Sequence, residues 1–370
     1  MKFTMERNAL LEALALAGRV AARRNTIPIL SHALVETGRG AVRVTVTDMD
    51  RLLTAEAEAV SIDGKGATTV SAHHLAAFVK ATPDGCQVEA ELKGGRLVLR
   101  AGRAKASLPT LDPKDFPVRT DEAFDVSLKV KASALALALK RVVHAQSNEE
   151  TRYYLNGVFL HRQDAGLRLV ATDGHRLAWA ALPIDEAVPA ELPGVIIPRA
   201  AVADLQAFAA GGDQVLEIHV SASRVRVTFG AVDYGTKLVD GTFPDYHRVI
   251  PTEFESGFEA GRAEFQSALA RCATLADVEG KGRAIKLTCE QGVVRLEGKA
   301  SDDGDVEDEL DARLHGKPAV TGFNSTYMAE ALAALAGPSL ELEISTGGPM
   351  ALRDPADRDA HLQIVMAMRV

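Results

Sequence analysis

The run Thr172-Asp173-Gly174-His175-Arg176 holds the residue types most capable of chemistry in this sequence, a carboxylate and an imidazole two positions apart. Such a pair could act in acid–base catalysis or bind a metal ion. The surrounding sequence offers no third ligand at a recognisable spacing, and it lacks nucleophile-elbow, Walker A and zinc-protease motifs in their proper context. We therefore favour a turn held by Asp173, and a hydrolase that uses Asp173 and His175 is kept as the third alternative.

The three cysteines, Cys86, Cys272 and Cys289, are scattered, with no CxxC pair and no histidine at ligand spacing. We expect reduced, mostly buried thiols and no bound metal. A single tryptophan and 5% aromatic residues argue against a sugar or cofactor cleft, so no cofactor is expected. No run reaches the roughly 18 apolar residues of a membrane helix, and residues 1–6 lack the apolar region of a secretory signal, which predicts a cytoplasmic protein.

The candidate turn belongs to a unit that occurs three times along the chain. Each copy has a glycine, apolar residues around an arginine, and then a hydroxyl–acid pair. The arginines are Arg43, Arg168 and Arg295, which are 125 and 127 residues apart. The pairs that follow are Thr47-Asp48, Thr172-Asp173 and Ser301-Asp302. Since each copy is large enough to bury its own core, the period predicts three domains: residues 1–125, 126–252 and 253–370.

Hydropathy patterns predict similar elements in each copy. Val42, Val44 and Val46 alternate with polar neighbours, which is typical of a strand with one buried face. Stretches with helical spacing and a helix start signal predict two helices per copy. The helices are expected over residues 7–22, 132–145 and 263–275, and from near Ser71, Arg199 and Ser325. The sequence thus predicts an α+β protein of three similar domains, each with two helices and antiparallel sheets.

Charge is distributed unevenly along the chain. The net charge of −8 is opposite to the usual excess of Lys and Arg in nucleic-acid-binding proteins. Basic residues nevertheless gather on or beside the expected helices, and they include Arg7, Arg19, Arg23, Arg24, Lys129, Lys131, Lys140, Arg141, Arg199, Arg271, Lys281 and Arg283. Acidic residues concentrate in the run 302–311. A basic helical face predicts sequence-independent binding of duplex DNA, and a triplicated scaffold with solvated helices is the alternative.

Several runs, in this order and from end to end of the chain, resemble the bacterial DNA polymerase III beta subunit family of sliding clamps. They are Met1-Lys2-Phe3-Thr4, Asn25-Thr26-Ile27-Pro28-Ile29-Leu30, Arg152-Tyr153-Tyr154-Leu155-Asn156-Gly157, Ala171-Thr172-Asp173-Gly174-His175-Arg176-Leu177-Ala178, Lys237-Leu238-Val239-Asp240-Gly241, Phe243-Pro244-Asp245-Tyr246 and Met366-Ala367-Met368-Arg369-Val370. The resemblance implies a head-to-tail homodimer, a ring of clamp domains that encircles duplex DNA and tethers the replicative polymerase. It also implies a processivity factor without enzyme activity.

In this family, the polymerase alpha subunit, the clamp loader and other proteins with a clamp-binding motif insert short peptides into a pocket. The matching positions are Leu155, Thr172, Gly174, His175, Leu177, Pro244, Arg248, Val249, Asn324, Tyr327, Met350, Ile364, Val365, Met366, Met368 and Arg369. The leucine, valine and methionine side chains among them are expected to form an apolar floor that adapts to different peptides.

The resemblance also implies that DNA is contacted by Arg24, Tyr153, Tyr154 and Arg199. Helix position and charge add Lys140, Arg141 and Arg271 as predicted DNA contacts. At the dimer interface, basic and apolar residues of the first domain are expected to meet the acidic run of the partner's third domain. The residues are Arg96, Arg103, Lys105, Leu108, Leu275, Asp302, Asp303, Asp305 and Glu307.

Three positions depart from the family pattern. Ala106 and Thr274 stand near positions where the family usually has an aromatic and an aliphatic residue, and Ala367 replaces a proline. A main replication clamp and a divergent second copy therefore both fit the sequence. The runner-up class is a triplicated DNA-binding or scaffolding protein that does not close into a ring, and ring closure separates the two.

Overall fold

The computed structural model describes residues 1–117, 123–210, 212–276, 284–300, 304–345 and 347–369. These residues form two compact units, of residues 1–130 with 214–238 and of residues 131–213 with 239–370. No helix among the described residues is both long enough and apolar enough to cross a membrane.

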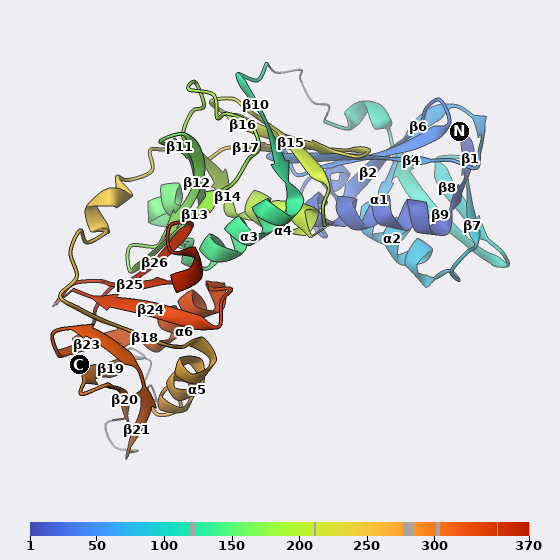
Figure 1. Ribbon diagram of the computed structural model, residues 1–370. Coiled ribbons are helices and arrows are strands. Elements are labelled where there is room, and N and C mark those ends of the chain that lie inside the picture. Colours follow the sequence, from blue (N-terminus) through green and yellow to red (C-terminus); the bar gives the residue numbers. More distant parts are fainter. Residues whose placement is uncertain (118–122, 211, 277–283, 301–303, 346, 370) are drawn as a thin grey trace. The chain divides into compact units, whose positions relative to one another are not determined.

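The first unit is built on one antiparallel sheet whose strands run in the order β10-β15-β16-β17-β4-β3-β2-β6-β9-β8-β7-β1-β5 (Figure 1). The strands are β1 Lys2–Glu6, β2 His32–Thr37, β3 Ala41–Thr47, β4 Arg51–Glu58, β5 Ser61–Gly64, β6 Gly66–Ser71, β7 Gln87–Lys93, β8 Arg96–Ala101, β9 Ala104–Leu111, β10 Val126–Lys131, β15 Val215–Val220, β16 Arg224–Phe229 and β17 Val232–Lys237. Two helices, α1 Arg7–Val20 and α2 Ala72–Ala81, pack against it. Helix α1 buries Leu10, Leu14 and Ala17, because their helical spacing places them on one side.

The second unit holds two sheets, in the orders β14-β11-β12-β13-β26-β25-β24-β18-β22 and β21-β20-β19-β23. Their strands are β11 Gly157–Gln163, β12 Gly166–Thr172, β13 Arg176–Leu182, β14 Val195–Pro198, β18 Ser256–Gly261, β19 Ala284–Glu290, β20 Val293–Ala300, β21 Gly304–Asp311, β22 Arg313–Gly316, β23 Ala319–Asn324, β24 Ser339–Ile344, β25 Met350–Arg353 and β26 His361–Val365. The helices are α3 Ala132–Val142, α4 Arg199–Ala209, α5 Arg262–Cys272 and α6 Ser325–Ala334. Asn324 caps α6 by accepting hydrogen bonds from the backbone N–H groups of Thr326 and Tyr327.

Short 3-10 helices connect these elements. They are η1 Pro28–Ser31, η2 Pro113–Asp115, η3 Val143–Ala145, η4 Glu150–Leu155, η5 Tyr246–Val249 and η6 Pro355–Asp357. Tyr153 and Tyr154 therefore lie on η4. Their rings meet edge to face at 5.8 Å between centroids, with Tyr153 exposed and Tyr154 half-buried.

The repeat predicted from the sequence is present in the strand register. Leu34 pairs with Thr45, which pairs with Thr54, and the second copy pairs Phe159 with Val170 and Val170 with Trp179. The last strands of the second and third copies each join the sheet of the copy before, since β17 pairs with β4 and β26 pairs with β13. The α+β class is confirmed, and the six α-helices of the described residues lie where they were predicted.

Candidate functional site

The turn from Thr172 to Arg176 is held by its own side chains. Thr172 Oγ1 donates a hydrogen bond to the Arg176 carbonyl at 2.6 Å. Asp173 Oδ1 accepts from the backbone N–H groups of His175 at 2.9 Å and of Arg176 at 3.0 Å, while Arg176 Nε donates to Asp173 Oδ2 at 3.0 Å. The Asp173 carboxylate is thus engaged in the turn, as predicted, and it does not orient His175 as a catalytic base.

The same turn occurs in the first unit, residue for residue. Thr47 Oγ1 donates to the Arg51 carbonyl at 2.7 Å, and Asp48 Oδ1 accepts from the N–H groups of Asp50 at 3.1 Å and Arg51 at 2.7 Å. Arg51 Nε closes the set with a 2.8 Å bond to Asp48 Oδ2. The predicted third copy, at residues 301–302, lies outside the described residues. This recurrence without a histidine identifies the turn as structural.

The turn places His175 and Arg176 beside Tyr327. The His175 ring stacks on the Tyr327 ring at 6.3 Å between centroids and an angle of 20°, and the Arg176 guanidinium lies 4.4 Å from that ring's centroid. Arg176 also forms an ion pair with Glu330 on α6. Because Asn324 caps the same helix, Tyr327 is fixed at both its backbone and its ring.

The C-terminal segment runs past the same turn. After β26, the Met366 N–H donates to the His175 carbonyl at 3.0 Å, and the Met368 N–H donates to the Gly322 carbonyl at 2.8 Å. Met366 stays exposed, and Met368 is half-buried. Two repeats of the chain are therefore tied together along this segment by backbone hydrogen bonds.

Of the predicted apolar floor, Leu155 and Leu177 are buried with Ile364 in one apolar cluster, whereas Val365 and Met350 are buried in another. Val249 and Met366, which were also predicted for the floor, are exposed. Met350 pairs with Val365 across β25 and β26, and its place in the pocket stays a prediction. The predicted residues that remain exposed are Gly174, His175, Pro244, Arg248, Val249, Met366 and Arg369. A peptide would meet these exposed groups first.

The predicted DNA contacts differ in their exposure. Arg24, after α1, is exposed, and so are Arg199 at the start of α4 and Lys140 near the end of α3. Glu149, which lies next to the two tyrosines, is paired with Arg152, and that hydrogen bond lowers the pKa of the Glu149 carboxyl. The charge of Glu149 is therefore compensated by Arg152, whereas Glu150 is exposed at the start of η4.

Arg141 was wrongly predicted to contact DNA. Its side chain is 4% exposed and forms an ion pair with Asp357, and its backbone carbonyl accepts from Gln363 Nε2 at 2.9 Å. An arginine held in this way cannot reach a phosphate. Arg271 is exposed, but its Nε donates to Asp308, a member of the acidic run, and this bond raises the pKa of Arg271.

Most of the described residues predicted at the dimer interface lie on or beside two strands with free edges, β9 and β21, whereas Arg96 lies on β8 and Leu275 follows α5. From Ala104 to Pro109, β9 pairs only with β8 among the described strands, and Arg103 and Lys105 are exposed on that hairpin. Arg96 donates to Ser107 Oγ at 2.8 Å within the same hairpin. The other edge strand is β21, which carries the exposed Asp305 and Glu307, and Leu108 and Leu275 are half-buried. Asp302 and Asp303 lie outside the described residues.

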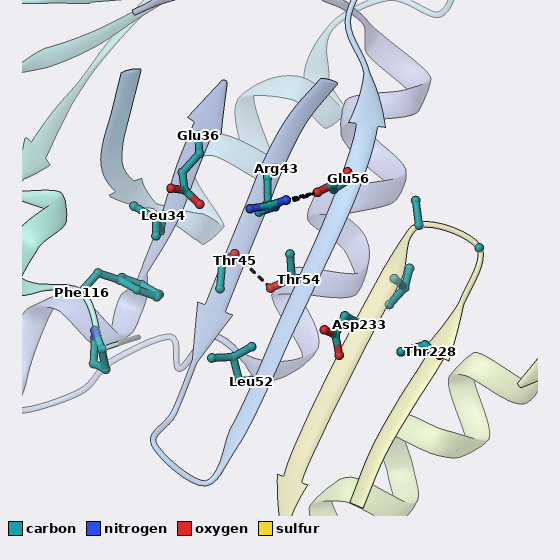
Figure 2. A pocket seen from close by; sticks show the side chains of 14 residues that line it. Leu34, Glu36, Arg43, Thr45, Leu52, Thr54, Glu56, Phe116, Thr228 and Asp233 are labelled. Atoms are coloured by element: carbon teal, nitrogen blue, oxygen red, sulfur yellow. Dashed lines mark hydrogen bonds and ion pairs between the residues drawn. The ribbon is translucent and has the colours of Figure 1, made fainter. Parts of the chain in front are cut away.

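Sequence reasoning missed a hollow of about 550 Å³ on the sheet of the first unit (Figure 2). It is lined by residues that include Leu34, Thr54 and Phe116, and the Arg43–Glu56 ion pair crosses it. The equivalent face of the second copy is filled by aromatic rings. There Phe159 stacks on Phe243 at 4.8 Å, and the Arg168 guanidinium covers Trp179 at 4.0 Å. Comparing Thr54 with Trp179 in the aligned repeats could have revealed the hollow.

Three family models match nearly the whole chain. They describe the N-terminal, central and C-terminal domains of the DNA polymerase III beta subunit, over residues 1–120, 129–245 and 247–369 respectively. Beta sliding clamps from Caulobacter vibrioides and Escherichia coli K12 are 36% and 32% identical to the chain, with complete coverage of both sequences. Sliding clamps of known structure from Bartonella birtlesii, bound to griselimycin, and from Pseudomonas aeruginosa superpose with TM-scores of 0.94, at 36% and 29% identity and complete coverage of both chains.

Proposed function

The chain belongs to the DNA polymerase III beta subunit family of sliding clamps, and on that premise we propose that two copies close head to tail into a ring around duplex DNA. It is a DNA sliding clamp for the replicative polymerase, a processivity factor that catalyses no reaction. The observation that supports the ring is the threefold repeat, in which the second and third copies each add their last strand to the sheet of the copy before. Work on replicating DNA would place the protein in the cytoplasm.

Exposed cations on the helices support the DNA-facing part of this proposal. Lys140 is exposed on α3 and Arg199 at the start of α4, and Arg24 is exposed in the segment after α1, so all three can approach phosphates without reading bases. Tyr153 adds an exposed ring on η4, and Arg271 contributes only where DNA displaces Asp308. Binding by phosphate contacts alone is weak, independent of sequence and sensitive to salt, as sliding requires.

The free edges of β9 and β21 support a head-to-tail contact. One edge is basic and the other acidic, so the first domain of one chain complements the third domain of its partner in charge as well as in hydrogen-bonding capacity. A contact between unlike surfaces forms a closed ring when its rotation closes. We propose that the domains in this contact are residues 1–125 and residues 253–370, with bounds taken from the sequence repeat.

The Tyr327 region and the C-terminal segment support a site for clamp-binding motifs. Val249, His175 and Met366 are exposed, whereas Leu155, Leu177 and Ile364 are buried in one cluster, and flexible methionines suit a surface that serves several partners. The proposed partners are the polymerase alpha subunit, the clamp loader and other proteins with a clamp-binding motif.

Retention on DNA tests encirclement directly. We expect the protein, loaded by a clamp loader and ATP onto nicked circular DNA, to stay on the circle through gel filtration. Cutting the circle should release it, because nothing but topology holds a ring that binds phosphates weakly. Equal release from circular and linear DNA would instead favour the open scaffold.

Charge reversal tests the dimer contact. The double variant Arg103→Glu, Lys105→Glu should raise the dimer dissociation constant at least about tenfold, because like charges would then face Asp305 and Glu307 of the partner subunit. Sedimentation at several protein concentrations measures this. Lys65→Glu, an exposed reversal in the same domain away from β9, is the matched control and should leave the constant unchanged. If the double variant dimerised with the same dissociation constant as the wild type, the interface would lie elsewhere.

A further inference from the structure

A histidine and a glutamate face each other across a glycine in the third repeat. His315 on β22 pairs with Gly257 on β18, and Gly257 pairs in turn with Glu343 on β24. A Cβ atom at position 257 would lie 2.8 Å from His315 Cε1 and closer still to its Nε2. The imidazole therefore lies over the glycine, and the missing side chain lets it extend across β18 toward β24.

Two buried carboxylates lie at the end of this row. Glu341 and Glu343 are two positions apart on β24 and so share a face of the sheet, at 6% and 9% exposure. Arg358 donates to Oε1 of both, at 2.9 Å and 3.0 Å. Oε2 of each glutamate has no hydrogen-bond partner among the described residues, and the nearest cation to Glu343 Oε2 is Arg353 Nη1, at 3.5 Å.

Unpartnered carboxylate oxygens in such a place are costly. Removing a charged oxygen from water without a compensating partner costs more than a neutral hydrogen bond returns. Burial is also the main cause that raises the pKa of the Glu341 carboxyl. Arg358 is half-exposed and satisfies only the first oxygen of each group. Among the described residues, Glu341 Oε2 has no hydrogen-bond donor, and Glu343 Oε2 has only the Arg353 guanidinium at 3.5 Å.

We propose that His315, Glu341 and Glu343 bind a divalent transition-metal ion of the zinc type. One ligand atom from each residue lies within 4.8 Å of the others. Zinc at about 2.0–2.1 Å from nitrogen and oxygen ligands requires separations of roughly 3.3 Å, which small rotations of the three side chains supply. Water would complete the tetrahedron.

The ligand set favours transition metals over Mg²⁺ or Ca²⁺. An imidazole suits zinc, copper, nickel and iron, whereas magnesium and calcium prefer all-oxygen sites. Arg358 fits this assignment, because hydrogen bonds to the non-ligating oxygens commonly orient metal-binding carboxylates. The ion would add to the positive charge that Arg353 and the half-exposed Arg358 already bring to the two carboxylates.

Titration of the full chain with ZnCl₂ tests this site. Protein treated with a chelator and dialysed should bind one zinc ion per chain with measurable heat, and Co²⁺ in place of zinc should give the visible absorption of a tetrahedral complex. His315→Ala and the near-isosteric Glu343→Gln should each weaken that binding at least about tenfold. His74→Ala removes an exposed histidine from α2 and is the matched control, expected to bind zinc as the wild type does.

Thermal unfolding gives a second readout. Zinc should raise the Tm of the wild type and of His74→Ala but not that of His315→Ala, since only a ligand that prefers the folded state stabilises it. The Tm values without metal show whether each variant folds. If the wild type and His315→Ala bind zinc with equal stoichiometry and affinity, or if neither binds it, the site does not exist. Retention on circular DNA is measured in a separate experiment, so a negative zinc result would not contradict the assignment as a sliding clamp.

Discussion

Tyr327→Ala, or deletion of residues 366–370, is expected to abolish binding of clamp-motif peptides while leaving the fold intact. Tyr327 is the ring against which His175 and Arg176 lie, and Met366 is the residue that ties the C-terminal segment to the turn. Losing an aromatic anchor at the centre of a binding site typically costs about 2 kcal/mol or more, which corresponds to roughly a thirtyfold loss of affinity.

Fluorescence anisotropy with labelled peptides from the polymerase alpha subunit and the clamp loader measures this loss. Val320→Ala removes an exposed apolar side chain, 59% accessible, from the same repeat and should bind as the wild type does. The Tm should stay close to that of the wild type, because Tyr327 and residues 366–369 have no fully buried side chain. Unchanged peptide affinity in Tyr327→Ala would show that the pocket has been assigned to the wrong residues.

Gly157→Ala is expected to destabilise the second unit strongly. Gly157 pairs with Pro198 at the meeting of β11 and β14, and an added Cβ would lie 3.0 Å from the backbone carbon of Ile197 and closer to its carbonyl oxygen. Backbone cannot move aside as a flexible side chain can, so overpacking of about 2–3 kcal/mol should lower the Tm by roughly 5–10 °C. The distortion would also reach η4, which carries Tyr153 and Leu155.

Gly166→Ala is the matched control for this change. Gly166 begins the neighbouring strand β12, and its added Cβ would meet nothing nearer than the Gln163 carbonyl oxygen at 3.8 Å. Its Tm should equal or slightly exceed that of the wild type, since alanine has less conformational freedom to lose on folding. Differential scanning calorimetry compares the two variants. If Gly157→Ala and Gly166→Ala had the same Tm, β11 and β14 would leave room for a Cβ atom at position 157.

Local patterns in the sequence were enough to predict the repeat and its helices. Alternation along residues 42–46 needs only the strand period, and a helix start such as Ser71 needs only one cap. The turn at Asp173 was also predictable, because an acidic side chain that bonds the next backbone N–H groups requires no distant partner. These features depend on residues close together in the chain.

Features that depend on distant segments were missed or wrongly assigned. Arg141 is buried by Asp357, more than two hundred positions away, although its place three residues after the buried Ala138 marked the apolar side of α3. The group of His315 with Glu341 and Glu343 exists only because β18 lies between β22 and β24, an order that hydropathy does not specify. The domain limits at residues 125 and 252 stay a prediction.

The pairing of β17 with β4 has a consequence for synthesis on the ribosome. Arg51 meets Thr236 in that pair, so the edge of the first sheet is unpaired until the end of the second repeat has been made. At about 5–20 residues per second, translation leaves that edge open for roughly ten to forty seconds. A nascent chain with an unpaired strand edge is prone to aggregate by pairing that edge with another chain. The nascent protein therefore acquires its first finished sheet only when two thirds of it exist.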